Sequence, residues 1–187
     1  MAEQKQPNRE RIVATANRLF YTKGYNQTSF AHVADELGLS KGNLHYHFRS
    51  KNELLDAVID LRMESIKQML ARWEKQYPDG KARLKRYARI LLNEAADVVR
   101  YGCPMGSLNM ELAKDQRDLQ QHSRDMLELF RRWLEKACKQ MGRRDYRALS
   151  LHIMARSQGA AMMAALYADV GLLKAEYKRL VDWIEML

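Results

Sequence analysis

Residues 28–51 place polar side chains that could contact DNA between apolar positions at helical spacing. Thr28 is a suitable N-cap for a first helix, and Gly38 can adopt the left-handed conformation that ends one. Ser40 is then a suitable N-cap for a second, short helix. Two helices joined by so tight a turn predict a helix-turn-helix. The apolar face of the first helix would consist of Phe30, Val33, Ala34 and Leu37.

The second of these helices would present hydrogen-bonding groups on its outer face. Leu39 and Leu44 anchor it on the first helix, so its other side chains point outward and can enter a major groove. Asn43 can pair with adenine through two hydrogen bonds, and Lys41 can donate to guanine. The outward residues are Lys41, Gly42, Asn43, His45 and Tyr46.

The segment resembles the TetR family of bacterial transcription regulators, continuously over about residues 9–60. Asn43 stands where Thr is commoner in the family, and His45 stands where Tyr is commoner. The matching residues are Thr28, Ala34, Gly38, Leu39, Ser40, Lys41, Gly42, Leu44, Tyr46, His47, Phe48, Ser50, Lys51, Glu53 and Leu54.

The resemblance implies two kinds of DNA contact from the helix-turn-helix. Base-edge contacts are expected from Lys41, Asn43 and His45, with close backbone approach at Gly42. Phosphate contacts are expected from Thr28, Tyr46, His47 and Lys51.

Composition and periodicity predict an all-α fold. The 187 residues are 47% apolar and include only three Pro, and apolar positions recur with a period of 3.6. We expect an N-terminal three-helix helix-turn-helix domain at residues 1–50. A long helix, opened by a capping box at Ser50–Glu53, would join it to a helical effector-binding and dimerisation domain at residues 51–187.

Element boundaries follow from the apolar pattern and from Gly and Pro. Residues 1–8 are expected to be a tail, followed by a support helix that Gly24 ends. The long helix should reach Tyr77, and further helices are expected over residues 81–101, 107–114, 116–141, 145–168 and 173–186.

Charge and cysteine content restrict the class of protein. The net charge is +9, but residues 1–60 hold eight Lys and Arg against seven Asp and Glu, so bulk charge does not locate the DNA site. Two cysteines are too few for a disulfide framework or a zinc site. His45 and His47 are two apart on a helix and cannot chelate a metal together. We therefore expect no metal and no cofactor. A signal peptide and a long apolar run are both missing, which predicts a cytoplasmic protein without membrane contact.

Apart from Met1, every Met and every Trp lies after residue 62. Flexible thioethers and rigid rings can line an adaptable apolar pocket, although an ordinary helical core uses the same residues. The pocket residues we expect are Met69, Trp73, Tyr87, Tyr101, Cys103, Met105, Met110, Phe130, Trp133, Met163 and Tyr167.

Cys103 precedes an expected helix start, where free N–H groups raise thiol reactivity, whereas Cys138 lies on an apolar face. Small residues around Ser157–Ala161 suit close helix packing. The resemblance places a dimer contact on the last two helices, as a four-helix bundle between subunits. The expected interface residues are Gly159, Ala160, Leu166, Leu180, Val181, Trp183, Ile184 and Leu187.

These patterns together predict a one-component transcriptional regulator with repression as the default. It would bind palindromic operator DNA as a homodimer, and a small apolar or aromatic effector would release it. Two alternatives within DNA binding remain, namely a ligand-independent architectural factor and a redox or electrophile sensor acting through Cys103. A cysteine-dependent enzyme is the alternative from another class, but it has no motif support.

Overall fold

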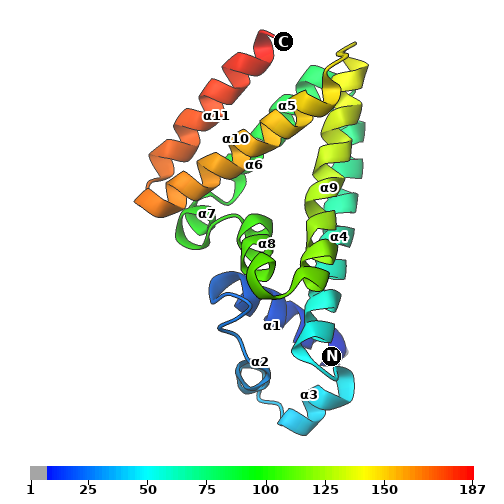
Figure 1. Ribbon diagram of the computed structural model, residues 1–187, viewed down its shortest axis with the longest axis vertical. Helices are drawn as coiled ribbons and strands as arrows, with labels where there is room; N and C mark the ends of the chain where they lie inside the picture. Colours follow the sequence, from blue (N-terminus) through cyan, green and yellow to red (C-terminus); the bar gives the residue numbers. More distant parts are fainter. Residues whose placement is uncertain (1–7) are drawn as a thin grey trace, which may run out of the picture. The chain divides into compact units, whose positions relative to one another are not determined.

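The computed structural model describes residues 8–187, without the side chain of Asp115. Every regular element in these residues is a helix, which confirms the all-α fold. The expected tail falls outside the described residues except for Asn8. The helices are α1 (Asn8–Thr22), α2 (Phe30–Leu37), α3 (Lys41–His47), α4 (Lys51–Gln76), α5 (Gly80–Ala88), α6 (Ile90–Asn93), α7 (Ala95–Tyr101), α8 (Pro104–Asp115), α9 (Arg117–Gln140), α10 (Tyr146–Tyr167) and α11 (Val170–Glu185) (Figure 1).

The helices form two compact units, each assembled from two chain segments. Unit 1 comprises the chain up to Glu64 together with Leu108–Arg124, and unit 2 comprises Ser65–Ser107 together with Asp125–Leu187. Helices α4, α8 and α9 therefore contribute residues to both units. The expected division into residues 1–50 and 51–187 concerns function and stays a prediction. The two units are defined by packing, and unit 1 also includes Leu108–Arg124, which is distant in the sequence.

Helix α1 supplies much of the core of unit 1. It buries Ile12, Ala16, Leu19 and Phe20, which recur at helical spacing, and also Val13, and Gly24 follows the helix with a φ of 88°. Tyr25 is then completely buried, with its ring edge against Phe20 at a centroid distance of 5.2 Å. This packing gives the helix-turn-helix a support.

The caps of the helix-turn-helix agree with the sequence at Gly38 and Ser40 but not at Thr28. Gly38 is left-handed with a φ of 64°, and the Ser40 hydroxyl accepts from the Asn43 N–H at 3.2 Å. The N-cap of α2 is Ser29, which forms a capping box with His32. Thr28 as the N-cap is therefore wrong, because its hydroxyl is used in the preceding turn.

Helix α4 begins where its capping residues predict. The Ser50 hydroxyl accepts from the Glu53 N–H at 3.1 Å, and the Glu53 carboxylate accepts from the Arg49 N–H at 2.8 Å. Both bonds satisfy N–H groups at the helix start that have no intrahelical acceptor. The helix ends before Pro78, close to the expected Tyr77.

The expected single helix over residues 81–101 is wrong, because α5, α6 and α7 occupy this segment. Breaks occur at Arg89 and at Glu94, whose backbone has φ −131° and ψ 42°. The broken segment packs against α10 and α11. Apolar periodicity could not reveal the breaks, since helical spacing continues across them in the buried residues Leu84, Tyr87, Leu91 and Val98.

Aromatic pairs join the helices of unit 2. Trp73 of α4 packs edge to face on Trp133 of α9 at 5.8 Å, and Tyr87 of α5 packs on Phe130 of α9 at 5.7 Å. All four residues are buried. None of the described helices is long and apolar enough to cross a membrane.

Candidate DNA-binding helix and effector cavity

Helix α3 exposes the side chains that the sequence assigned to base reading. Leu44 is completely buried and holds the helix on unit 1, while Lys41, Gly42 and Asn43 are exposed. Tyr46 is 86% exposed, an unusual position for a large ring without a partner molecule. The helix therefore presents a continuous polar face.

The two histidines of α3 lie against aromatic rings. His45 is exposed, and its ring is 5.0 Å from the Phe30 ring of α2. The half-buried His47 ring meets the Tyr46 ring edge to face at 5.1 Å. These contacts restrict the rings while leaving polar atoms to bond a partner.

Two of the expected phosphate contacts, Thr28 and Lys51, lie in the packing of unit 1. Thr28 is 1% exposed, and its hydroxyl donates to the Gly24 carbonyl at 2.7 Å. The Lys51 ammonium donates to the Tyr25 carbonyl at 3.1 Å and lies 4.1 Å from the centre of the Tyr25 ring. Burial lowers the pKa of Lys51. Both side chains bond backbone carbonyls of the turn after α1.

Glu111 of α8 fixes the same turn, and no sequence signal pointed to it. Its carboxylate accepts from the Tyr25 N–H and from the Asn26 N–H, each at 2.9 Å. The partners are more than 80 residues apart, so no local pattern could have paired them. The carboxylate satisfies two backbone donors between the support helix and α2.

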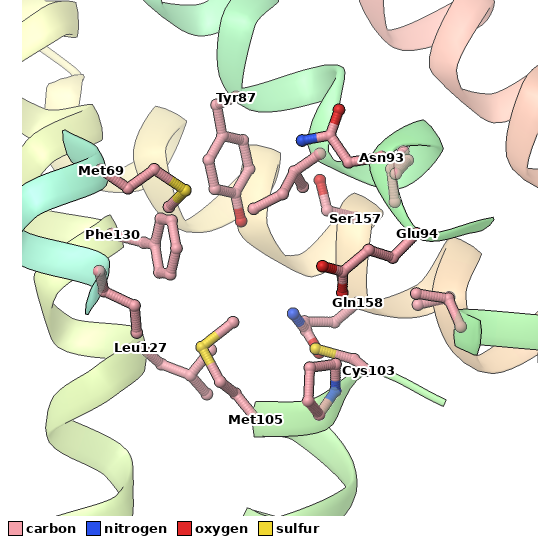
Figure 2. Close-up of a pocket in the computed structure, with 16 residues that line it drawn as sticks. Met69, Tyr87, Asn93, Glu94, Cys103, Met105, Leu127, Phe130, Ser157 and Gln158 are labelled. Carbon is pink, nitrogen blue, oxygen red and sulfur yellow. The ribbon is translucent and has the colours of Figure 1, made fainter. Parts of the chain in front are cut away.

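Unit 2 contains a mostly apolar cavity of about 220 Å³ between α4, α5, α6, α7, α8, α9 and α10 (Figure 2). A mostly apolar lining with a few polar groups is typical of sites for small organic molecules. The lining residues are Ile66, Met69, Tyr87, Ile90, Leu91, Asn93, Glu94, Val98, Cys103, Pro104, Met105, Leu127, Phe130, Ser157, Gln158 and Ala161.

The structure brings five of the expected pocket residues together in this cavity. These five are Met69, Tyr87, Cys103, Met105 and Phe130. Burial raises the pKa of Tyr87, so its hydroxyl stays protonated. The cavity also has four polar lining residues that were not expected, because an isolated polar residue between apolar ones predicts a solvent-facing position. These are Asn93, Glu94, Ser157 and Gln158.

The other six expected pocket residues lie elsewhere. Trp73 and Trp133 are buried against each other, and the Arg86 guanidinium lies 3.8 Å from the centre of the Trp73 ring. Tyr101 ends α7 outside the cavity lining. Three others belong to exposed surfaces, namely Met110 of α8 and Met163 and Tyr167 of α10.

The two cysteines have different surroundings. Cys103 lines the cavity directly before α8, and its sulfur accepts from the Gly106 N–H at 3.5 Å. Cys138 is completely buried, and this burial raises its pKa to about 11. Within residues 8–187, no three side chains of His, Cys, Asp or Glu are grouped so that they could hold a metal ion.

The expected dimer residues divide between core and surface. Ala160, Leu180 and Ile184 are buried within the chain, so these three do not offer area to a second subunit. Leu166 is 70% exposed. Gly159, Val181, Trp183 and Leu187 are half-buried. Two further apolar residues of α10, Leu151 and Met162, are also exposed.

Known proteins resemble this chain both in the helix-turn-helix segment and in the overall fold. Residues 12–58 match the family model described as bacterial regulatory proteins, tetR family. An uncharacterized HTH-type transcriptional regulator of Lactococcus lactis subsp. lactis, encoded in the lacX 3′ region, is 28% identical over 182 residues, covering 90% of this chain and 89% of that protein.

A second relative matches over a shorter stretch. HTH-type transcriptional regulator TtgR of Pseudomonas putida is 36% identical over 58 residues, which are 31% of this chain and 28% of that protein. Among solved structures, a TetR transcriptional regulator from Legionella pneumophila superposes with a TM-score of 0.84 at 23% identity, covering 95% of this chain and 97% of that one.

The family model covers the helix-turn-helix, and the Legionella structure shows the same fold over nearly the whole chain. The relatives are regulators of transcription. The chain belongs to the TetR family of bacterial transcription regulators, and it is a DNA-binding protein of the helix-turn-helix type.

Proposed function

We propose that this protein is a homodimeric repressor that binds a palindromic operator through α3 and is released by an apolar or aromatic effector in the cavity of unit 2. The observation that carries this proposal is the presence of both sites in one chain, an exposed polar face on α3 and an apolar cavity behind Tyr87 and Phe130. In a ligand-independent architectural factor, such a cavity would have no role.

The short length of α3 supports a dimer. Helix α3 has seven residues, too few for specific recognition by one copy, so two copies would bind half-sites about one helical turn apart. Exposed apolar side chains on α10 support a self-complementary contact. Leu151, Met162 and Leu166 recur there at helical spacing.

Coupling between effector and DNA would run through helices shared by the two units. Met69 of α4 lines the cavity, and Lys51 at the start of the same helix donates to the Tyr25 carbonyl. An effector shifts the protein only if it binds the DNA-incompetent arrangement more tightly than the competent one. Operator DNA must then weaken effector binding by the same factor.

This reciprocity is the test of the proposal. A duplex selected from a random pool by its binding to the protein serves as operator, and a ligand found by Trp fluorescence is titrated with and without it. We expect each to weaken the other by about 1 to 3 kcal/mol, a factor of roughly 5 to 150. A ligand that binds tightly, and with the same affinity in the presence and absence of operator, would contradict the proposal.

A sensor of electrophiles is the second candidate, favoured by the position of Cys103 on the cavity wall with its sulfur hydrogen-bonded to the Gly106 N–H. Timed alkylation with iodoacetamide, followed by mass spectrometry, tests it. Cys103 should react first, because the raised pKa of Cys138 leaves almost no thiolate near neutral pH. Earlier reaction at Cys138, or operator binding that is unchanged after complete alkylation of Cys103, would remove this candidate.

A further inference from the structure

The cavity of unit 2 has an apolar side made of polarizable groups. Figure 2 shows Met69, Leu127 and Phe130 on this side, with the Tyr87 hydroxyl directed toward the centre. Tyr87 and Phe130 are almost completely buried. Aromatic rings and thioether sulfur atoms attract apolar and aromatic bodies, and ring faces also attract cations. This side would hold the body of a ligand.

The opposite side is polar. Figure 2 shows the Glu94 carboxylate and the Gln158 amide near each other on this side of the cavity. Glu94 occupies the N-cap position of α7, but its side chain does not cap that helix. No hydrogen bond or ion pair joins its carboxylate to the described part of the chain. The carboxylate is thus free to accept from a ligand.

The break between α6 and α7 gives Glu94 this position. Its φ of −131° and ψ of 42° lie outside the helical region, whereas Asn93 ends α6 and Ala95 begins α7. Glu94 is a solvent-exposed residue on a segment that otherwise buries Leu91 and Val98. Sparsely populated backbone conformations are common where a side chain must be aimed at a ligand.

The charge at the cavity has one sign. Among the described lining residues Glu94 is the only one with an ionised side chain, and Lys, Arg and His do not occur among them. This contrasts with a net charge of +9 for the chain. A carboxylate beside apolar walls favours a cationic group and disfavours an anionic one.

We propose that the cavity selects apolar or aromatic molecules that carry a protonated amine, and that Glu94 recognises the amine while Met69, Tyr87 and Phe130 hold the apolar body. This inference rests on the proposed effector site. It adds the chemical class of the effector and a specificity-determining residue that the sequence analysis did not find.

Three probes with one apolar body and different polar ends test the inference. They are 4-phenylbutylamine, 4-phenylbutan-1-ol and 4-phenylbutanoate, titrated into the full-length protein by calorimetry at constant ionic strength. We expect the amine to bind roughly tenfold more tightly than the alcohol, as for one charge-assisted hydrogen bond, and the carboxylate to bind most weakly. Because Glu94 is exposed, added salt should reduce the advantage of the amine.

Variants assign the preference to Glu94. Glu94→Gln should lower amine affinity to that of the alcohol and leave alcohol affinity unchanged, and Glu94→Lys should make 4-phenylbutanoate the tightest probe. Asp97→Asn is the matched control, since it removes the same charge from the exposed side of α7 without touching the cavity lining. Circular dichroism melts verify that each variant is folded.

The outcomes separate this inference from the proposed function. If the alcohol and the amine bind the wild-type protein equally, or if Asp97→Asn lowers amine affinity as much as Glu94→Gln does, amine recognition by Glu94 is refuted and the effector cavity stands. If none of the three probes binds the wild-type protein, the effector cavity fails together with this inference.

Discussion

Asn43 has an exposed side chain, and its N–H is bonded to the Ser40 cap of α3. The amide of such a residue is free to pair with a base. We predict that Asn43→Ala costs roughly 1 to 3 kcal/mol of binding free energy on a selected duplex and much less on random DNA. Fluorescence anisotropy titrations with both duplexes measure the difference. Equal losses on the two duplexes would show that Asn43 does not read a base.

Lys51 makes contacts within unit 1 that point to a structural role beside the expected phosphate contact. Its ammonium bonds the Tyr25 carbonyl and lies over the Tyr25 ring. We therefore predict that Lys51→Ala destabilises the free protein by roughly 1 kcal/mol, the scale of one hydrogen bond. The exposed Lys41→Ala should leave the free energy of unfolding unchanged. Urea titrations compare the variants. Unchanged stability of Lys51→Ala, with weaker binding to all DNA, would instead support a phosphate contact.

At the scale of elements, α8 supports the helix-turn-helix through one carboxylate. Glu111 accepts from the N–H groups of Tyr25 and Asn26, between α1 and α2. Glu111→Ala leaves both donors without this acceptor, so we predict a loss of about 1 to 3 kcal/mol in the free energy of unfolding. The neighbouring Met110 is 68% exposed, and Met110→Ala is the control. Thermal melts that do not distinguish the two variants would contradict this role.

For the whole molecule, the exposed apolar residues of α10 lead to a prediction about assembly. We expect Leu166→Glu to convert the proposed dimer to monomers, because each interface would bury two unpaired carboxylates. Operator affinity should fall with dimerisation. Sedimentation velocity measures the first effect and anisotropy the second. Met110→Glu, an equally exposed position on α8, should stay dimeric. A Leu166→Glu protein that remains dimeric would place the interface elsewhere.

Features that depend on local physics could be predicted from the sequence. The helical period, the Gly38 turn, the Ser40 cap and the start of α4 near Ser50 each follow from residues within a few positions of one another. The exposure of Lys41 and Asn43 follows as well, since both are polar and Leu44 supplies the buried apolar side chain of α3.

Features that join distant segments depend on how the helices pack, and the sequence pattern did not reveal them. Glu111 meets the turn at Tyr25, the buried Ala160 and Leu180 are removed from any subunit contact, and Trp73 pairs with Trp133 outside the cavity. The break at Glu94 preserves apolar spacing, so periodicity could not show it. Periodicity reports which face of a helix is apolar, whereas packing between elements decides whether that face meets a core, a cavity or another subunit.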